Sequence, residues 1–123
     1  MHVFLDTYAI LAFLEGSPAY ARVKLPGGAT HEMNLLEAAT ILLRRGHKNP
    51  WRLLGRLDLQ AIASTPVDLA AAALLKASDE GRRRGLSYVD VLSYAVARRM
   101  RLPFATGDKG FQGLPGVDFR PAA

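Results

Sequence analysis

Four acidic residues stand where apolar segments of this chain begin or end, and together they suggest metal chemistry. They are Asp6, Glu37, Asp90 and Asp108. If the strands of the fold are parallel, these carboxylates meet at one edge of the sheet, where such sheets bind ligands. Convergent carboxylates repel one another, and a hard divalent cation such as Mg²⁺ or Mn²⁺ removes that repulsion. Because a metal ion can activate water for attack on a phosphodiester, the pattern predicts that reaction.

The same acids have a simpler explanation as helix caps. Residues 34–37 and 87–90 both place an acid three positions after a polar residue, as in a capping box. Asp6 and Asp108 can each cap a following helix. Residues 65–68 carry the same pattern and serve as a control to which we assign no chemistry. For a single acid capping is the stronger interpretation, whereas four acids on separate segments among apolar neighbours favour a metal site.

The elements that position these acids follow from hydrophobic periodicity and from turn signals. Strands are predicted over residues 2–5, 29–33, 59–64, 102–106 and 117–119. Helices are predicted over residues 7–15, 19–25, 34–45, 50–56, 65–80 and 87–101, with a connection at 82–86 and a short turn or helix at 108–112. Alternating strands and helices predict an α/β fold with a parallel sheet covered on both faces. The length of 123 residues predicts one domain, residues 1–123.

Charge and composition narrow the possible functions. The formal net charge is +5, and twelve of the sixteen basic residues are arginine, which favours a polyanionic partner such as nucleic acid. The alternative is that these arginines are solvated helix ends. The absence of cysteine excludes a disulfide framework, a cysteine zinc site and a cysteine nucleophile. His2, His31 and His47 are scattered, and we interpret them as structural or surface residues.

The sequence also bears on location. The chain enters a strand-like segment at once, without a basic leader and apolar stretch. The apolar residues 69–77 are too short to cross a bilayer, which needs about 20 residues. We therefore expect a soluble, cytoplasmic protein that does not bind a membrane.

Four segments carry a resemblance to a known family. They are residues 4–7 (FLDT), 34–38 (NLLEA), 87–97 (SYVDVLSYAVA) and 105–111 (ATGDKGF). With these motifs in this order the chain resembles the PIN-domain family of nucleases, and within it the small VapC-like toxins of toxin–antitoxin pairs. The resemblance implies a three-layer α/β/α sandwich with a mainly parallel sheet of about five strands. It also implies endonuclease activity on RNA that depends on Mg²⁺ or Mn²⁺, a cognate antitoxin protein and a homodimer.

The resemblance also assigns roles to individual residues. It implies that Asp6, Glu37, Asp90 and Asp108 are catalytic and hold the metal directly or through water. Thr106 matches a position where the family often has a small hydroxyl residue beside the acids. The alternative interpretation is that Thr106 only forms hydrogen bonds with the local backbone at the end of a strand. Thr7 and Asn34 are candidates for a supporting role. We predict that Thr106 and four basic residues contact RNA. The basic residues are Arg44, Arg45, Arg98 and Lys109.

Three functional hypotheses remain open from the sequence. The first is a Mg²⁺- or Mn²⁺-dependent endoribonuclease, the toxin of a toxin–antitoxin pair. The second is a non-catalytic domain of the same fold that binds RNA or protein and uses its acids as helix caps. The third, which we rank lowest, is a phosphatase or receiver domain with Asp6 as phosphoryl acceptor. Residues 10–14 and 53–57 are candidates for core or dimer interface, and core is the preferred interpretation.

Overall fold

The structure is a computed structural model that describes residues 1–23 and 27–122. Its centre is a sheet of five short parallel strands in the order β3-β2-β1-β4-β5. The strands are β1 (Phe4–Leu5), β2 (Ala29–His31), β3 (Gln60–Ile62), β4 (Phe104–Thr106) and β5 (Val117–Phe119). All five predicted strands are thus confirmed in existence, and each lies within its expected segment.

The strand order reverses between β1 and β4. From β1 the chain passes outward through β2 to β3, and it then crosses back to β4 on the other side of β1. β1 and β4 pair directly, with Phe4 beside Phe104 and Leu5 beside Ala105. In open parallel sheets a ligand binds at such a switch point, beyond the carboxyl ends of the two central strands.

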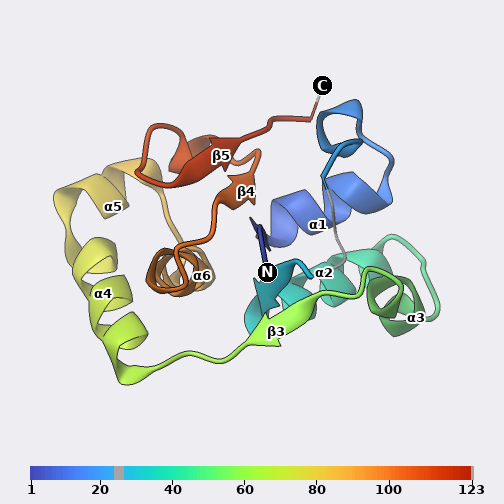
Figure 1. Ribbon diagram of the computed structural model, residues 1–123, viewed down its shortest axis with the longest axis horizontal. Helices are drawn as coiled ribbons and strands as arrows, with labels where there is room; N and C mark the ends of the chain where they lie inside the picture. Colours follow the sequence, from blue (N-terminus) through green and yellow to red (C-terminus); the bar gives the residue numbers. More distant parts are fainter. Residues whose placement is uncertain (24–26, 123) are drawn as a thin grey trace.

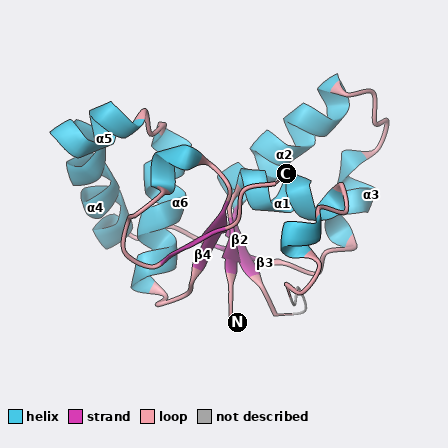
Figure 2. Ribbon diagram, turned by 90° about the horizontal axis from the view of Figure 1, so that it is seen from above, coloured by secondary structure: helices cyan, strands magenta, loops and turns pink. Residues whose placement is uncertain are grey.

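Helices cover both faces of the sheet, which confirms the predicted three-layer α/β/α architecture (Figures 1 and 2). On one face lie α1 (Thr7–Leu14), α2 (Glu32–Arg44) and α3 (Pro50–Gly55). On the other lie α4 (Pro66–Ala77), α5 (Asp79–Arg84) and α6 (Tyr88–Arg99). Two short 3₁₀ helices are η1 (Pro18–Tyr20) and η2 (Lys109–Phe111). Among the described residues no helix is both long and apolar enough to cross a membrane.

Successive strand residues point to opposite faces and so build two cores. Leu5 packs into the core beneath α1 and α2, whereas Phe4 and Phe104 pack beneath α6. The rings of Phe4 and Phe104 stack with their centroids 5.6 Å apart. Ile10 and Leu54 are buried in the α1–α2 core, so the preferred interpretation of residues 10–14 and 53–57 as core is confirmed there.

The predicted helix over residues 65–80 is wrong in one respect, because the chain forms two helices there. Ser78 has an extended backbone that ends α4, and its hydroxyl accepts a hydrogen bond from the Gly81 amide at 3.0 Å. This cap starts α5, which takes in the last two residues of the predicted helix and residues 82–84 of the predicted connection. Gly85 then ends α5 in the left-handed conformation, at φ 67°.

The start of α2 also differs from the prediction. β2 ends at His31, and α2 begins at Glu32, two residues before the predicted start at Asn34. His31 is itself the cap, since its Nδ1 accepts a hydrogen bond from the Met33 amide at 3.1 Å. The predicted helix 19–25 is wrong over its first five residues: the short 3₁₀ helix η1 takes up residues 19–20, and residues 21–23 are not helical. Its last two residues lie outside the described residues.

Candidate active site

The carboxyl edge of the sheet collects the predicted acids from four elements. Asp6 directly follows β1, and Asp108 follows β4 after a single glycine, Gly107. Asp90 lies in the first turn of α6 and Glu37 in the second turn of α2. Because β1 and β4 are neighbours at the switch point, the first two carboxylates enter the region where ligands bind such sheets.

Asp6 is the most enclosed of the four acids, with 4% of its surface exposed. Its Oδ1 accepts a hydrogen bond from the Ala9 amide at 2.9 Å, and its Oδ2 accepts one from the Thr106 hydroxyl at 2.6 Å. The same hydroxyl oxygen accepts a hydrogen bond from the Asp108 amide at 3.1 Å. Thr106 is fully buried. Its burial favours a role in positioning Asp6 and Asp108, and it disfavours the predicted role of Thr106 in contacting the substrate.

Electrostatics links the acids of this edge to one another. Burial raises the pKa of Asp6 to about 7, against the lowering effect of its two hydrogen bonds, and the charges of Asp90 and Asp108 raise it further. Burial also raises the pKa of Asp90, and the charges of Asp108 and Glu37 contribute in the same direction. The charges of Asp6, Asp90 and Asp108 therefore disfavour one another, and Glu37 acts on Asp90.

Glu37 is held by a chain of side chains rather than by a helix end. The Thr7 hydroxyl donates to its Oε1 at 2.7 Å, and the Asn34 side-chain amide donates to the Thr7 oxygen at 3.2 Å. Asn34 is buried, and its Oδ1 has no hydrogen-bond partner within the described structure. Since His31 caps α2, the capping explanation for Glu37 is wrong.

The capping explanation is correct for the other three acids but leaves their charge uncompensated. Asp6 caps α1, Asp90 forms a capping box with Ser87, and Asp108 accepts a hydrogen bond from the Gly110 amide. Within residues 1–23 and 27–122 none of the four acids makes an ion pair. A cap needs a carboxylate oxygen, but it does not need four unpaired carboxylates at one edge of a sheet.

These residues suit a hard cation by their chemistry. Carboxylate oxygens are the ligands that Mg²⁺ and Mn²⁺ prefer, and the buried Asn34 Oδ1 is a further oxygen without a partner. In the described part of the chain, no three histidine, aspartate or glutamate side chains already surround a point that could hold an ion. Three of the carboxylates are instead directed at backbone amides, so binding requires some of them to turn toward a shared ion.

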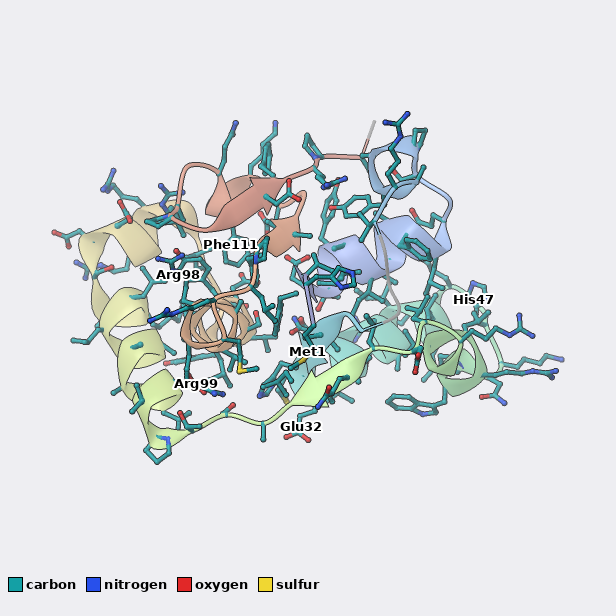
Figure 3. The ribbon with its side chains drawn as sticks, in the orientation of Figure 1. Met1, Glu32, His47, Arg98, Arg99 and Phe111 are labelled. Atoms are coloured by element: carbon teal, nitrogen blue, oxygen red, sulfur yellow. The ribbon has the colours of Figure 1, made fainter. Side chains whose placement is uncertain are left out.

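The residues predicted to contact RNA lie in three separate places. Lys109 is exposed and adjacent to Asp108. Arg44 and Arg45 lie at the carboxyl end of α2, where Arg45 is paired with Glu15. Arg98 lies at the end of α6 opposite to Asp90, on the α4 side of the molecule (Figure 3). Of these four, only Lys109 adjoins an acid of the carboxyl edge, and the roles of all four stay predictions.

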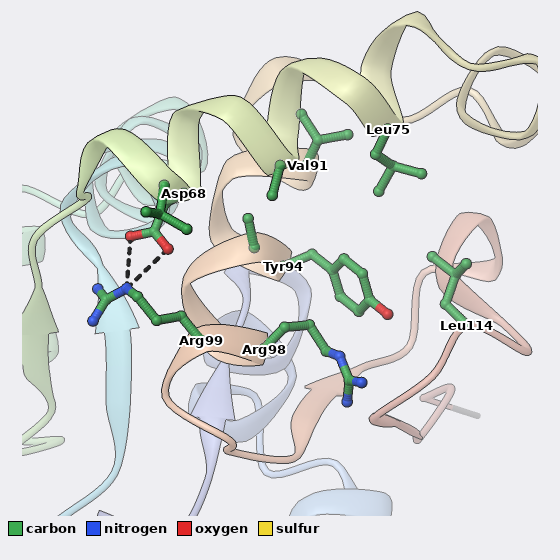
Figure 4. A pocket seen from close by; sticks show the side chains of 10 residues that line it. Asp68, Leu75, Val91, Tyr94, Arg98, Arg99 and Leu114 are labelled. Carbon is green, nitrogen blue, oxygen red and sulfur yellow. Dashed lines mark hydrogen bonds and ion pairs between the residues drawn. The ribbon is translucent and has the colours of Figure 1, made fainter.

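A sizeable cavity of the molecule does not lie at the acids. It has a volume of about 530 Å³ and lies between α4 and α6, with Val91, Tyr94 and Leu114 among its lining residues. Asp68, the control acid, lines it and is bound by Arg99 (Figure 4). None of Asp6, Glu37, Asp90 and Asp108 contributes to this cavity, so its volume is no argument for the proposed metal site.

Sequence reasoning missed Gly107 as a residue that shapes the site. A Cβ atom placed on Gly107 would lie 2.1 Å from Cε1 of Tyr8 and 2.7 Å from the carbonyl oxygen of Arg120. Only glycine therefore allows the turn that carries Asp108 to pack against α1. The signal in the sequence was a glycine between a strand and an acid, but its packing partner Tyr8 is distant along the chain.

The fold and the site together define an α/β/α domain with an acidic centre at the carboxyl edge of its sheet. A model of the PIN domain matches residues 3–117, so the chain belongs to the PIN domain family. The resemblance seen in the sequence is thereby confirmed. No curated protein matches the chain.

Solved structures show the same fold over nearly the whole chain. The Mycobacterium tuberculosis toxin VapC20, described as cleaving the sarcin–ricin loop, is 27% identical with a TM-score of 0.74, over 97% of this chain and 99% of that one. A toxin–antitoxin complex from Klebsiella pneumoniae is 18% identical with a TM-score of 0.73, over 94% of both chains. PAE2754 from Pyrobaculum aerophilum is 18% identical with a TM-score of 0.63, over 100% and 90%.

Proposed function

We propose that this protein is a Mg²⁺- or Mn²⁺-dependent endoribonuclease and the toxin of a toxin–antitoxin pair. The observation that carries the proposal is a group of four carboxylates near the switch point of a PIN domain, none of which has an ion-pair partner among residues 1–23 and 27–122. Its structural neighbour VapC20 is described as a toxin that cleaves the sarcin–ricin loop, which supports RNA as the substrate class. The net charge of +5 suits a polyanionic substrate.

Each residue has a distinct part in this proposal. Asp6, Asp90 and Asp108 would hold the ion, and Glu37 would do so directly or through water. The ion, when bound, activates water for attack and stabilises the leaving oxygen of the phosphodiester. Thr106 fixes the carboxylate of Asp6, and Thr7 fixes that of Glu37. Because the pKa of Asp6 is about 7, this carboxyl must lose a proton before it can act as a ligand near neutral pH.

The proposed partners are an antitoxin protein and a second copy of the chain. The Klebsiella pneumoniae neighbour was solved as a toxin–antitoxin complex, which supports an antitoxin. For the homodimer the chain offers α4, a helix whose Val67, Leu69 and Leu74 are more than half exposed. Monomeric proteins rarely leave a helix this apolar uncovered. We therefore assign the dimer contact to α4 rather than to residues 10–14 and 53–57, whose Ile10 and Leu54 are buried in the core.

The test is cleavage of RNA in the presence of Mg²⁺ or Mn²⁺. We expect Asp6→Asn and Asp90→Asn each to slow cleavage at least about 100-fold while the protein stays folded, because a lost metal ligand matters more than a lost supporting contact. Asp68→Asn is the matched control, since Asp68 occupies the same position of an identical capping pattern. Cleavage that survives in both site variants would show that the assigned site is wrong.

A second candidate function rests on the three confirmed caps. Under it the domain binds RNA or protein without catalysis, and the acids only stabilise helix ends. A titration with Mn²⁺, followed by thermal unfolding, separates the two functions. The non-catalytic function predicts no stabilisation by the ion. The third hypothesis, a phosphorylated Asp6, is disfavoured because the segment at residues 6–8 (DTY) has no second acid two residues after Asp6.

A further inference from the structure

A basic and aromatic surface lies away from the acids, at the end of the molecule formed by α3 and the end of α2. Between Glu37 and Asp58 the sequence contains no acidic residue. The same stretch contains five arginine or lysine residues, all of them exposed: Arg44, Arg45, Lys48, Arg52 and Arg56. His47, exposed in the same loop, marks this surface at one end of the long axis, opposite to Arg98 (Figure 3).

The only tryptophan of the chain lies within this surface. Trp51 is 57% exposed in α3, although tryptophan is usually covered by other side chains. Its position is fixed from both sides: Pro50 before it is buried, and Leu54 after it is buried in the α1–α2 core. Asn49 caps the helix by accepting a hydrogen bond from the Arg52 amide. A flat ring is therefore held in solvent by a fixed backbone, on a helix that also carries the exposed Arg52.

In the other arginine clusters, at residues 82–84 and 98–101, half of the arginines have acidic partners. Arg82 pairs with Asp79, Arg84 with Glu80, and Arg99 with Asp68. In the surface around Trp51 only Arg45 has an acidic partner within the described structure, and that partner is Glu15. The remaining charges are not neutralised by the protein itself, so they suit a polyanion that arrives from solution.

The helix α2 connects this surface to the proposed active site. Glu37 and Arg44 are seven residues apart in α2, which places them on the same face of the helix and about 10 Å apart along its axis. One strand of nucleic acid can span that separation with a few nucleotides. A chain bound around Trp51 can therefore continue along α2 toward the carboxylates.

We infer that the surface formed by Arg44, Lys48, Trp51, Arg52 and Arg56 binds single-stranded RNA. Trp51 stacks on a base, and the arginines contact the phosphates on either side. Stacking requires a base with an unstacked face, and an exposed indole among cations is the arrangement by which proteins bind single strands without reading sequence. That RNA is the nucleic acid involved rests on the proposed function. The surface would hold substrate beyond the cleavage site and thereby affect binding rather than the chemical step.

The experiment uses the full chain in EDTA, so that no cleavage occurs, and a single-stranded RNA of about 12 nucleotides. Fluorescence of the single tryptophan reports stacking, and anisotropy of a labelled RNA reports binding. We expect saturable quenching of the tryptophan and binding that is about tenfold weaker in Trp51→Ala, with Trp51→Phe much closer to the parent. Arg52→Glu should weaken binding and lower the salt dependence by about one phosphate contact.

Arg83→Glu is the matched control, because it makes the same charge change at an exposed arginine of α5, at the other end of the molecule. Binding that weakens equally in Arg83→Glu and Arg52→Glu, or that leaves Trp51 unquenched, would overturn the assignment. Equal affinity for polyglutamate would assign the surface to acidic proteins instead. The assay needs neither metal nor catalysis, so loss of cleavage in Asp90→Asn with RNA binding intact would separate this surface from the proposed active site.

Discussion

Two helices on the same side of the sheet begin with the same local pattern and differ in what surrounds their acids. Thr65 and Asp68 form a capping box at the start of α4, and Ser87 and Asp90 form one at the start of α6. In both boxes the acid accepts a hydrogen bond from the first residue's amide at 2.8 Å. Locally the two helix starts are therefore equivalent.

The difference lies in the charges that the rest of the fold brings to each acid. Nε of Arg99 lies 2.9 and 3.0 Å from the two carboxylate oxygens of Asp68. Figure 4 marks both interactions with dashed lines. Burial acts to raise the pKa of Asp68, but the hydrogen bonds from Arg99 and Thr65 outweigh it and the pKa falls. Asp90 has no basic partner in the described structure, so burial raises its pKa and the charges of Asp108 and Glu37 add to the rise. A cap is thus compatible with either a structural or a functional acid, and the distant partner separates the two.

The largest effect is expected at Asp6, the buried acid that Asp90 faces. Its pKa is about 7 in the folded protein against 3.8 unfolded, so the folded state holds the proton more tightly. In EDTA, stability should therefore fall as the pH rises from about 4 to about 7, by up to about 4 kcal/mol. Asp6→Asn should remove this loss, since asparagine can still cap α1. Urea unfolding at pH 4 and pH 8 measures it.

If the parent and Asp6→Asn lose equal stability between those pH values, Asp6 is not the group that titrates. The effect would then belong to Asp90 or to another acid of the cluster. Repeating the experiment with Asp90→Asn, whose pKa is also raised, separates the two carboxyls.

The second prediction compares the two capping boxes directly in their response to Mn²⁺. At pH 8 a saturating ion should raise the free energy of unfolding of the parent and of Asp68→Asn, by about 2.7 kcal/mol at 100 times the dissociation constant. Asp90→Asn should show little of this gain, because it lacks a ligand. Thermal unfolding with and without the ion gives the answer, and equal stabilisation of both variants would remove the distinction between the two helices.

Without metal, the substitution at Asp68 should be the more damaging of the two to stability. In EDTA, Asp68→Asn should cost about 2 kcal/mol of stability, because it leaves Arg99 without its charged partner. Asp90→Asn should cost less or even stabilise, because it removes repulsion from Asp108 and Glu37. Urea unfolding at pH 8 compares the two variants. A greater loss at Asp90 than at Asp68 would mean that Asp90 serves the fold rather than a ligand.

Features that depend on local spacing could be predicted from the sequence, and contacts between distant residues could not. The alternation of strands and helices predicted the parallel sheet, and the placement of Asp6 and Asp108 after strands predicted that they would lie at one edge. The capping boxes at residues 65–68 and 87–90 could also be predicted, since capping depends only on local spacing. What the sequence did not show is that Arg99 reaches Asp68 and that Thr106 reaches Asp6, because these pairs lie 31 and 100 residues apart.

Two local errors have the same origin. The prediction started α2 at Asn34 because asparagine caps helices well, but His31 performs that task and Asn34 turns inward to Thr7. It ran α4 through Ser78 because the apolar periodicity continues there, but the Ser78 hydroxyl accepts from Gly81 and ends the helix. In both cases several polar residues could cap, and tertiary packing selected among them.

The smallest effects are expected from the capping hydroxyls themselves. Thr65→Ala and Ser87→Ala each remove one hydrogen bond to the amide of the acid, so each should cost about 1 kcal/mol in EDTA. The Ser87 hydroxyl bonds the backbone amide of Asp90 and not its carboxylate. Ser87→Ala should therefore keep most of the stabilisation by Mn²⁺ that Asp90→Asn loses. Urea unfolding with and without the ion tests both statements. If Ser87→Ala loses the response to Mn²⁺ as completely as Asp90→Asn does, the cap and the proposed ligand act as one unit.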